Sequence, residues 1–498
     1  MVRNNQYYSI LDRFLNIAEK SGEKIAVISG NINYTYEYIN KMSDIVANFL
    51  KRNLAESTQK IIGLHMKRSE KFVICLLGIM KSGNIYLPLD IDIPRKRMGH
   101  MIDESKCNLI ISDFDFNKSE QYKCNYVNIT TILQNTYEYN NHKLYTPEKF
   151  SYIIFTSGTS GMPKGVLISY EALCSFSYNF GRAFFSDNSK KMLSLSPISF
   201  DISLAEVLIP LFYGKTVYIA SDTDVNNPRK LGDIIYKNEI DILQITPSRM
   251  EILISAMKDN TFLSNIKQIL LGGENIPKHL LNKLQKQKNY KIFNLYGPTE
   301  TTIWCMYSDI TRANQIVIGK PFDGNLVKLF DEEMNEINYG IGEILISGNQ
   351  LTSYYLNDKK LIREKFIIHN NVMWYKTGDL GKYSKNQEIV FIGRKDNQIK
   401  YHGMRIELEE ISNILLKYDS ITNAVTILYR KKKVNILCSF IVANEIVLES
   451  TLKNYLKDFL PANVIPNAII QLKTIPINKR GKINTQKLNE ECEKHYGK

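Results

Sequence analysis

The sequence predicts an α/β protein. A large N-terminal domain with α/β sheet subdomains and a small β-rich subdomain is expected to precede a small α+β C-terminal domain. Short apolar runs alternate with helical patterns between residues 34 and 295, and from Asn325 short apolar runs are separated by Gly, Asn and Asp. The charged sequence Gly-Arg-Lys-Asp at 393–396 follows an apolar run. We therefore expect domains at 1–395 and 396–498.

The N-terminal elements follow from capping residues and apolar spacing. Thr35 can cap a helix that extends through Leu50. A strand is expected at 61–65, then a helix that Ser69 caps and Gly83 ends, then a strand at 85–89. These alternating elements are typical of a sheet covered by helices.

The same alternation continues along the chain. Buried strands are expected at 152–155, 192–196, 216–220, 242–245, 268–271 and 291–295, with helices at 204–213, 248–257 and 277–288. The β-rich subdomain should contain strands at 327–330, 342–347 and 388–392. The C-terminal domain should contain helices at 407–416 and 452–459 and strands at 424–428 and 435–442.

Composition excludes several classes of protein. The 498 residues, 44% of them hydrophobic, are enough for two or more cores. No apolar run reaches the roughly 18 residues of a membrane span, and the polar start is no signal sequence, so a cytoplasmic protein is expected. Seven cysteines without Cys-x-x-Cys spacing support neither a disulfide framework nor a zinc site. The net charge of +13 is compatible with an acidic partner, but no basic run is interleaved with aromatics, so no nucleic acid is expected.

The stretch 152–165, YIIFTSGTSGMPKG, has the composition of a phosphate-binding loop. An apolar strand breaks into a segment rich in backbone and hydroxyl donors, which suit polyphosphate oxygens. These donors come from Thr156, Ser157, Gly158, Thr159, Ser160, Gly161 and the ammonium group of Lys164. A Walker loop needs Gly-Lys-Ser/Thr, whereas Pro163 and Gly165 flank this lysine. The sequence therefore indicates a nucleoside triphosphate in another fold, or else a Ser/Gly linker.

Four polar or aromatic residues further along suit the rest of a nucleotide. Glu300 follows a Gly-Pro turn and can hold Mg²⁺. Asp379, in a Thr-Gly-Asp turn, can accept from both ribose hydroxyls. Tyr296 offers a ring for adenine stacking, and Asn294 can pair with the adenine edge. The Gly-Pro before Glu300 could instead be a plain turn, Tyr296 a core aromatic residue and Asp379 a helix cap.

Together these motifs resemble the adenylate-forming (ANL) superfamily, and within it the amino-acid adenylation domains of nonribosomal peptide synthetases and free-standing amino acid–carrier protein ligases. The resemblance covers nearly the whole chain because the motifs occur in the family's order. They are LPLD at 87–90 with Pro94, the loop at 156–165, FDIS at 200–203, NLYGPTE at 294–300, YKTGD at 375–379, GRKDNQIK at 393–400, GMRIE at 403–407 and NKRGK at 478–482.

The resemblance implies roles for individual residues. ATP would contact Thr156, Ser157, Gly158, Thr159, Gly273, Glu274, Asn294, Tyr296, Thr299, Asp379 and Arg394. Mg²⁺ would be held by Glu300, and catalysis would depend on Lys482 with Thr156 and Lys164. A carboxylate attacks the α-phosphorus, and the Lys482 ammonium would offset the repulsion between these two anions. The C-terminal domain would then rotate about a hinge at Asp396 to admit a thiol.

The resemblance also implies the substrate. Asp201 stands where relatives that activate amino acids pair with the substrate ammonium, and the expected pocket consists of Asp201, Ile202, Ala205, Gln244, Leu270, Gly272, Leu295, Ile303 and Trp304, with Lys482. This set resembles glycine-selecting domains, because Trp304 and Ile202 would fill the space of a side chain. Ala205 departs from that pattern by being small, and would leave room for alanine or serine.

The resemblance implies the acceptor as well. The sequence stops sixteen residues after Lys482, so a free-standing ligase is expected, which transfers its product to the phosphopantetheine thiol of a separate carrier protein. ATP and Mg²⁺ would be required. Three alternatives stay open: a D-alanine–carrier protein ligase, an organic-acid CoA ligase, which Asp201 disfavours, and a non-catalytic adenylate-binding protein.

Overall fold

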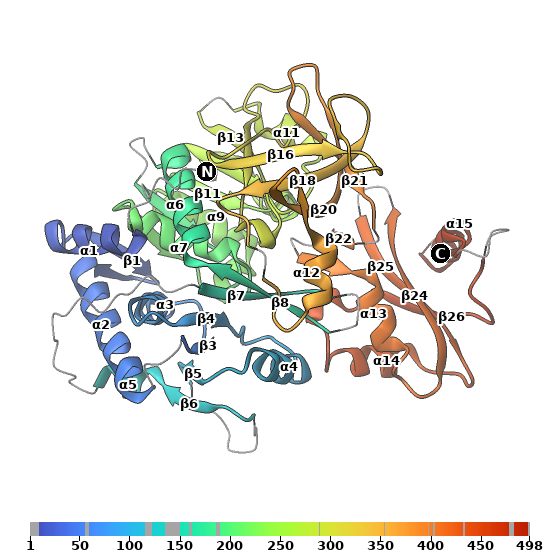
Figure 1. Ribbon diagram of the computed structural model, residues 1–498, viewed down its shortest axis with the longest axis horizontal. Helices are drawn as coiled ribbons and strands as arrows, with labels where there is room; N and C mark the ends of the chain where they lie inside the picture. Colours follow the sequence, from blue (N-terminus) through green and yellow to red (C-terminus); the bar gives the residue numbers. More distant parts are fainter. Residues whose placement is uncertain are drawn as a thin grey trace. The chain divides into compact units, whose positions relative to one another are not determined.

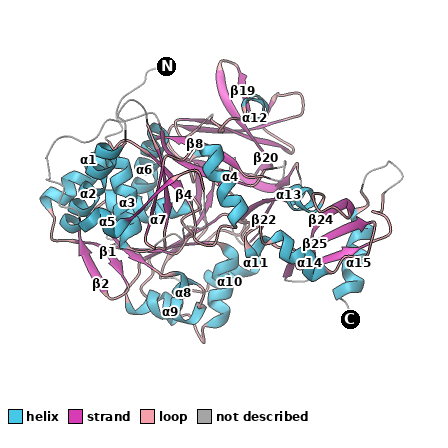
Figure 2. Cartoon of the chain, turned by 90° about the horizontal axis from the view of Figure 1, so that it is seen from below, coloured by secondary structure: helices cyan, strands magenta, loops and turns pink. Residues whose placement is uncertain are grey.

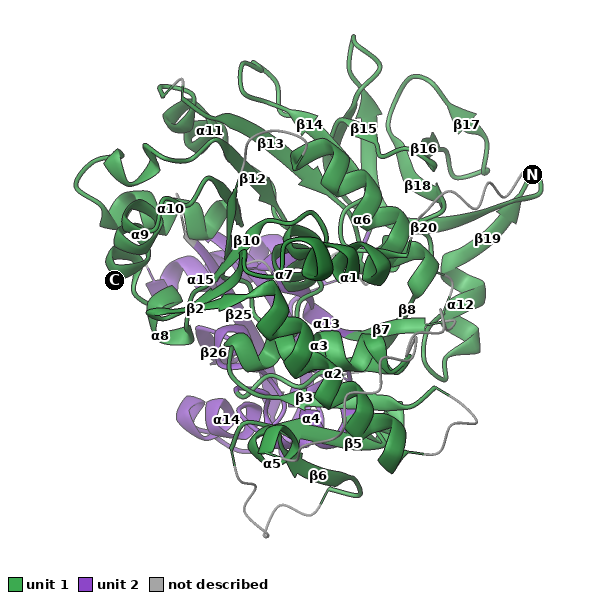
Figure 3. Ribbon diagram, turned by 90° about the vertical axis from the view of Figure 1, so that its left-hand side faces the viewer, with its two compact units in different colours: residues 1–91, 102–154, 165–395 green, residues 92–101, 155–164, 396–498 purple. Residues whose placement is uncertain are grey.

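The computed structural model divides into two compact units, coloured separately in Figure 3. Unit 1 contains residues 1–91, 102–154 and 165–395, and unit 2 contains 92–101, 155–164 and 396–498. The structure describes residues 9–54, 59–114, 122–134, 150–158, 162–185, 190–287, 289–352, 354–396, 398–401, 404–431, 434–477 and 483–496. Unit 2 thus includes two segments, 92–101 and 155–164, that lie within the predicted N-terminal domain. The division into a catalytic N-terminal domain and a moving C-terminal domain stays a prediction.

A nine-stranded sheet in unit 1 has the order β15-β14-β13-β12-β11-β9-β10-β1-β2. Strands β13 through β1 are parallel to their neighbours, whereas β14, β15 and β2 at the edges are antiparallel. The bounds are β1 Ile25–Ser29, β2 Ile32–Thr35, β9 Lys191–Ser194, β10 Thr216–Ile219, β11 Ile242–Ile245, β12 Gln268–Gly272, β13 Lys291–Tyr296, β14 Met306–Asp309 and β15 Lys320–Pro321. Parallel strands end along one edge, which is where ligands bind in sheets of this kind.

A six-stranded sheet has the order β6-β5-β3-β4-β7-β8, and its strands from β6 to β7 are parallel. The bounds are β3 Ile61–His65, β4 Ile85–Pro88, β5 Leu109–Ser112, β6 Asn125–Asn128, β7 Phe150–Thr156 and β8 Lys164–Ser169. Strands β3, β4 and β5 are almost completely buried, as expected for short apolar runs in a parallel sheet.

Helices pack on these sheets and on one another, and α2 and α3 lie side by side (Figure 1). Their bounds are α1 Ile10–Lys20, α2 Tyr36–Asn53, α3 Glu70–Lys81, α4 Arg95–Ser105, α5 Ile129–Gln134, α6 Tyr170–Phe184, α7 Ile202–Phe212, α8 Asp222–Val225, α9 Pro228–Lys237, α10 Pro247–Ala256, α11 Lys278–Leu284 and α12 Lys359–Lys365, with 3-10 turns η1 Thr261–Leu263 and η2 Thr299–Thr301. Helix α7 is buried along its length after Ile202, which fixes the residues at its N-terminal end.

The β-rich part of unit 1 is an antiparallel sheet of order β17-β16-β18-β20-β19, with β21 beside β20. The bounds are β16 Asn325–Phe330, β17 Glu336–Ile337, β18 Gly342–Gly348, β19 Phe366–His369, β20 Val372–Tyr383 and β21 Ile389–Arg394. The register of β20 and β21 places Asp379 opposite Arg394.

Unit 2 has its own core, in which α13 and α14 pack on a three-stranded sheet of order β24-β25-β26. Figure 2 shows these helices and α15 as cyan coils among magenta strands. The bounds are β22 Gln398–Tyr401, β23 Met404–Glu407, α13 Leu408–Leu415, β24 Ile421–Lys431, β25 Val434–Ala443, α14 Glu449–Leu456, η3 Ala462–Val464, β26 Ala468–Gln471 and α15 Thr485–Tyr496.

The predicted α/β class is confirmed, and two strands, Ile61–His65 and Ile242–Ile245, have the predicted bounds. Thr35 caps α2 as predicted, by accepting from the amide of Tyr38 at 3.2 Å. The prediction that the Ser69 side chain caps α3 is wrong. Ser69 occupies the N-cap position of α3, but its backbone is fully extended, at φ −165° and ψ 178°, and its hydroxyl makes no cap hydrogen bond to the described residues.

Candidate active site

The carboxylate of Asp379, within β20, is the centre of a hydrogen-bonded group that includes the last residues of β13 and β21, Tyr296 and Arg394. The Tyr296 hydroxyl donates to Oδ2 at 2.5 Å, and Nη1 of Arg394 donates to Oδ1 at 2.5 Å. Nη2 of Arg394 also donates to the carbonyl of Thr377 at 3.1 Å, and the Asp379 amide donates to the Thr377 hydroxyl at 2.9 Å. Three predicted nucleotide-binding residues from distant parts of the sequence are therefore in direct contact.

The ring of Tyr296 is buried, and so is the amide of Asn294. Burial, followed by the charge of Asp379, raises the pKa of Tyr296 well above its ordinary value, so the phenol stays protonated and donates. Nδ2 of Asn294 donates to the backbone carbonyl of Val317 at 2.7 Å. This bond fixes the amide of Asn294 at the strand end, and the predicted contacts of both side chains with adenine stay predictions.

Gly273 and Glu274 follow strand β12 directly, and Thr299 opens the η2 turn after β13. Gly273 has φ +84°, a conformation that favours glycine. Oε2 of Glu274 accepts from the amide of Ser248 at 3.0 Å and from its hydroxyl at 2.5 Å, which ties this carboxylate to the start of α10. All three lie after the carboxyl ends of parallel strands, as expected for ligand-binding residues.

Glu300 has no exposed surface, and its Oε1 accepts from the hydroxyl of Tyr355 at 2.7 Å. Among the described residues no cluster of three His, Cys, Asp or Glu side chains could hold a metal alone. A single oxygen donor nevertheless fits Mg²⁺, which commonly takes one or two carboxylates and completes its shell with phosphate oxygens and water. If bound there, the ion would neutralise negative charge on the phosphates.

The turn after Glu300 is strained. Thr302 and Ile303 both have left-handed backbones, with φ +60° and +65°, which is rare for residues with branched side chains. Gln350, also fully buried, donates through Nε2 to the carbonyls of Thr302 at 3.4 Å and Trp304 at 2.8 Å. The Thr302 hydroxyl donates back to the Gln350 carbonyl at 2.8 Å. These bonds hold the turn that joins the predicted metal ligand to the predicted pocket.

Two of the predicted pocket residues, Trp304 and Gln244, are joined by a buried hydrogen bond. Nε1 of Trp304 donates to Oε1 of Gln244 at 3.0 Å, and only 2% of Trp304 is exposed. A Cβ atom on Gly272 would lie 2.6 Å from Cη2 of Trp304, so the indole lies directly over this glycine. Trp304 therefore contacts two other residues of the predicted pocket, Gln244 and Gly272, and its role in selecting a substrate stays a prediction.

Asp201 lies at the N-cap position of α7 and is 7% exposed. Its side chain does not cap the helix within the described part of the chain. Burial, and after it the charge of Asp201, raises the pKa of Tyr152 well above its ordinary value, which places this carboxylate near strand β7. The remaining predicted pocket residues are apolar and mostly buried: Ile202 and Ala205 on α7, Leu270 on β12, Leu295 on β13, and Ile303.

The predicted phosphate loop belongs to unit 2 as far as Lys164. Thr156 and Ser157 are buried, Gly158 follows them, and Lys164 begins β8. The Ser157 hydroxyl donates to the carbonyl of Arg405 at 2.9 Å. Asp396, the predicted hinge, accepts from the amide of Gln398 at 3.3 Å. Thr159 and the predicted catalytic Lys482 lie outside the described residues.

Sequence reasoning missed three buried polar residues of this region: Tyr355, Gln350 and Glu206. A signal existed for Glu206, because it is the only charged residue within the apolar run of α7. Tyr355 and Gln350 carried no such signal, since their partners are far away in the sequence.

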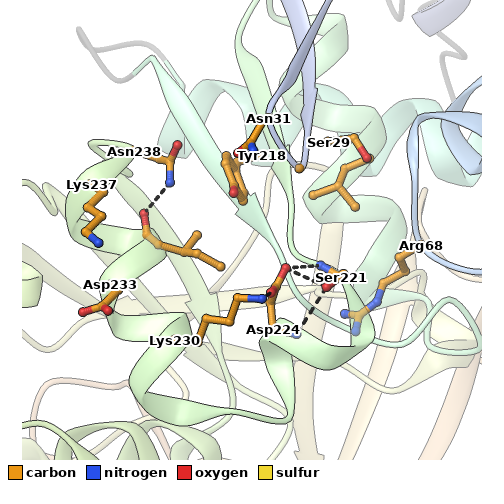
Figure 4. Close-up of a pocket in the computed structure, with 13 residues that line it drawn as sticks. Ser29, Asn31, Arg68, Tyr218, Ser221, Asp224, Lys230, Asp233, Lys237 and Asn238 are labelled. Carbon is orange, nitrogen blue, oxygen red and sulfur yellow. Dashed lines mark hydrogen bonds and ion pairs between the residues drawn. The ribbon is translucent and has the colours of Figure 1, made fainter.

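A hollow of about 500 Å³ lies elsewhere in unit 1 (Figure 4). Two of its basic groups pair with acidic groups. Lys230 contacts Asp224 at 2.6 Å, Asp224 and Ser221 form a capping box, and Nη2 of Arg68 contacts Asp222 at 2.6 Å. These groups hold the fold around α8 and do not point to a ligand.

Comparison with known proteins gives a consistent result. The family described as "AMP-binding enzyme" matches residues 14–356. The chain is 30% identical to bacitracin synthase 3 of Bacillus licheniformis over 485 residues, which cover 95% of this chain but 8% of that protein. It shares a fold with o-succinylbenzoate CoA synthetase of Bacillus subtilis, with a TM-score of 0.86, 20% identity and 96% and 98% of the two chains covered. It also matches AB3403, a four-domain nonribosomal peptide synthetase bound to AMP and glycine, with a TM-score of 0.73 and 26% identity; the match covers 96% of this chain and 36% of that chain.

None of the described helices is long and apolar enough to cross a membrane.

Proposed function

The chain belongs to the family of AMP-binding enzymes, and we propose that it activates an amino acid, most favourably glycine, as aminoacyl-AMP with release of pyrophosphate. The aminoacyl group would then pass to the phosphopantetheine thiol of a carrier protein. The observation that carries this proposal is that buried Asp201 opens α7 and that the Trp304 indole, bonded to Gln244, lies over Gly272. A buried carboxylate among mainly apolar side chains suits a substrate ammonium group.

The Asp379 group supports the nucleotide part of the proposal. A carboxylate has about four lone-pair positions, so Asp379 can accept from ribose hydroxyls while Tyr296 and Arg394 hold it in place. Glu300, held by Tyr355, would provide an oxygen for Mg²⁺ beside the phosphates. The loop at 156–165 would bind the phosphates, and Lys482 would stabilise the negative charge that develops as the substrate carboxylate attacks the α-phosphorus.

The pocket supports a small substrate. The indole of Trp304 is fixed by a hydrogen bond and is fully packed, so a larger substrate side chain would overlap with it, and close-packed interiors do not absorb such overlap cheaply. AB3403, the multidomain relative with 26% identity, was itself crystallised with AMP and glycine, which agrees with this proposal.

A pyrophosphate–ATP exchange assay with a panel of amino acids tests the proposal. We expect exchange with glycine to exceed that with L-alanine, D-alanine and serine. A clear preference for D-alanine would favour the D-alanine ligase, and a preference for any larger residue would refute glycine. Exchange with no amino acid, together with product formed from an organic acid and CoA, would refute amino-acid activation altogether.

A further inference from the structure

Glu206 stands on α7 directly after Ala205, and its carboxylate has no exposed surface. Four donors surround it. The amides of Leu195 and Ser196 donate to Oε2 at 2.8 and 2.9 Å. The Ser196 hydroxyl and Nε2 of Gln244 donate to Oε1 at 2.6 and 3.3 Å. Backbone N–H groups can only donate, so Oε2 of Glu206, which faces both of them, must be an acceptor.

The two hydrogen bonds that link Trp304 to Gln244 and Gln244 to Glu206 have a fixed direction. An ionised carboxylate only accepts and an indole N–H only donates, so the amide between them can satisfy both in one orientation alone. Burial raises the pKa of Glu206, whereas the hydrogen bonds from Ser196, Leu195 and Gln244 lower it and favour the ionised form. Gln244 takes that orientation, with Nε2 toward Glu206 and Oε1 toward Trp304. Nε2 also donates to the carbonyl of Ile202 at 3.3 Å, which favours the same orientation.

We propose that Glu206 is a specificity-determining residue that acts through Gln244. It fixes the Gln244 amide so that Oε1 accepts from the indole of Trp304, and this bond holds the indole over Gly272, where it excludes substrate side chains. Glu206 itself does not touch the substrate, so it is a positioning residue. The inference rests on the proposed activation of a small amino acid and adds a residue outside the predicted pocket.

The substitution Glu206→Gln disrupts this arrangement of donors and acceptors while keeping the shape of the side chain. The new amide must turn its oxygen toward the Leu195 and Ser196 amides, because these can only donate. Its NH₂ group then faces Gln244. If Gln244 turns to accept, its own NH₂ meets the indole N–H; if it does not, two NH₂ groups face each other. Either arrangement places a donor against a donor and weakens the hold on Trp304.

The first test is kinetic. We expect Glu206→Gln to lower the ratio of kcat/KM for glycine over that for alanine by about tenfold, the scale of one lost hydrogen bond. Ser196→Ala is the matched control, because it removes a donor from the same carboxylate without touching Gln244. It should leave the ratio unchanged. A general disturbance of the fold would instead lower activity with both substrates alike.

A double-mutant cycle separates this role from a merely structural one. In a Trp304→Phe background the indole N–H is absent, so adding Glu206→Gln should not change the glycine-to-alanine ratio further. An unchanged ratio in Glu206→Gln alone, or the same fall in both backgrounds, would overturn the inference. If the wild-type protein exchanges with no amino acid, the proposed function fails before any variant is made.

The second test does not need activity. The chain has two tryptophans, Trp304 and Trp374, so Trp374→Phe leaves the pocket indole as the only tryptophan emitter. We expect the emission maximum or quenching of Trp304 to change when Glu206→Gln is added, and to stay unchanged when Ser196→Ala is added, with helical content unaltered by circular dichroism. Identical spectra for the Trp374→Phe protein with and without Glu206→Gln would overturn the inference, whatever the substrate.

Discussion

The hydroxyl of Tyr355 donates a hydrogen bond of 2.7 Å to Oε1 of Glu300, a carboxylate with no exposed surface. Only 4% of Tyr355 is exposed, and its ring packs near Phe366, with ring centroids 5.8 Å apart. A rigid aromatic side chain therefore fixes one oxygen of the predicted Mg²⁺ ligand. Residues behind a metal ligand commonly tune affinity in this way.

Removing this hydroxyl should weaken the response to Mg²⁺. We expect Tyr355→Phe to raise the Mg²⁺ concentration needed for half-maximal pyrophosphate exchange by about tenfold, since hydrogen bonds to charged groups contribute about 1.5–3 kcal/mol. The KM for the amino acid should change little. Tyr354→Phe, at the exposed neighbouring tyrosine, is the control. An unaltered Mg²⁺ dependence in Tyr355→Phe would remove Tyr355 from this role.

The hydroxyl of Tyr296 should matter for ATP. Tyr296→Phe keeps the ring but removes the donor to Oδ2 of Asp379, so we expect the KM for ATP to rise by about tenfold while the KM for glycine stays near its original value. Because burial and the Asp379 charge raise the pKa of Tyr296 well above 10, the phenol stays a donor throughout the assay range. The effect of the substitution should therefore be the same at pH 7 and pH 9.

Titration of ATP at the two pH values measures this. Tyr307→Phe, whose ring stacks on Phe322, serves as a control for loss of a hydroxyl elsewhere in the fold. An effect of Tyr296→Phe that disappears at pH 9 would mean that the phenol ionises in the wild-type protein, contrary to the raised pKa.

The fold was largely predictable because its strands are short apolar runs. Ile61–His65 and Ile242–Ile245 match at both ends: the apolar part of the first lies between Lys60 and His65, and Asp241 and Thr246 flank the second. Helix α6, Tyr170–Phe184, was not predicted, although Ser169 caps it by accepting from the Ala172 amide. Its buried residues include Ser175, Ser177 and Asn179 beside the apolar ones, so the buried surface of this helix is wider than its apolar pattern indicates.

The site was predictable only as a set of residues. Asp379 and Arg394 could be named from motifs, but their contact depends on the register of β20 and β21, which no local pattern specifies. The partner of Glu300 lies 55 residues away at Tyr355, and Gln350 reaches Trp304 across 46 residues. Contacts of this kind follow from tertiary packing, so sequence spacing does not indicate them.

A buried ion pair joins α2 and α3 far from the predicted site. Nζ of Lys81 contacts Oδ1 of Asp44 at 2.8 Å, and the side chains are 3% and 7% exposed. Lys81→Met should destabilise the protein by about 3–5 kcal/mol, because it leaves the Asp44 charge buried alone. Asp44→Asn added to Lys81→Met should recover most of that loss. Urea denaturation of the two variants measures both effects, and a double variant no better than Lys81→Met would contradict the assignment.

The same lysine should affect the pH dependence of stability. Burial lowers the pKa of Lys81, although the charge of Asp44 acts in the opposite direction. In the alkaline range the unfolded chain therefore binds more protons than the folded protein at this position, so this lysine makes stability rise with pH there. The double variant Lys81→Met/Asp44→Asn should lack that contribution. Its free energy of unfolding should therefore rise less with pH in the alkaline range than that of the wild-type protein. Urea midpoints measured from neutral pH to pH 10 would show the difference.

Gln350 should hold the strained turn through its NH₂ group rather than by filling space. Nε2 donates to the carbonyls of Thr302 and Trp304, whereas Oε1 accepts from Asn325 at 2.7 Å. Gln350→Glu keeps the shape and the bond from Asn325, but it points an oxygen at carbonyl groups. Gln350→Met loses the hydrogen bonds without adding repulsion.

We therefore expect Gln350→Glu to be the more damaging of the two, with a melting temperature several degrees below that of Gln350→Met and a larger loss of kcat/KM for exchange. Two adjacent left-handed residues cost about 1–3 kcal/mol each, so the turn needs this support to keep Glu300 and Trp304 in place. If shape alone mattered, the nearly isosteric glutamate would be tolerated better than methionine, and that order of melting temperatures would disprove the role assigned to the NH₂ group.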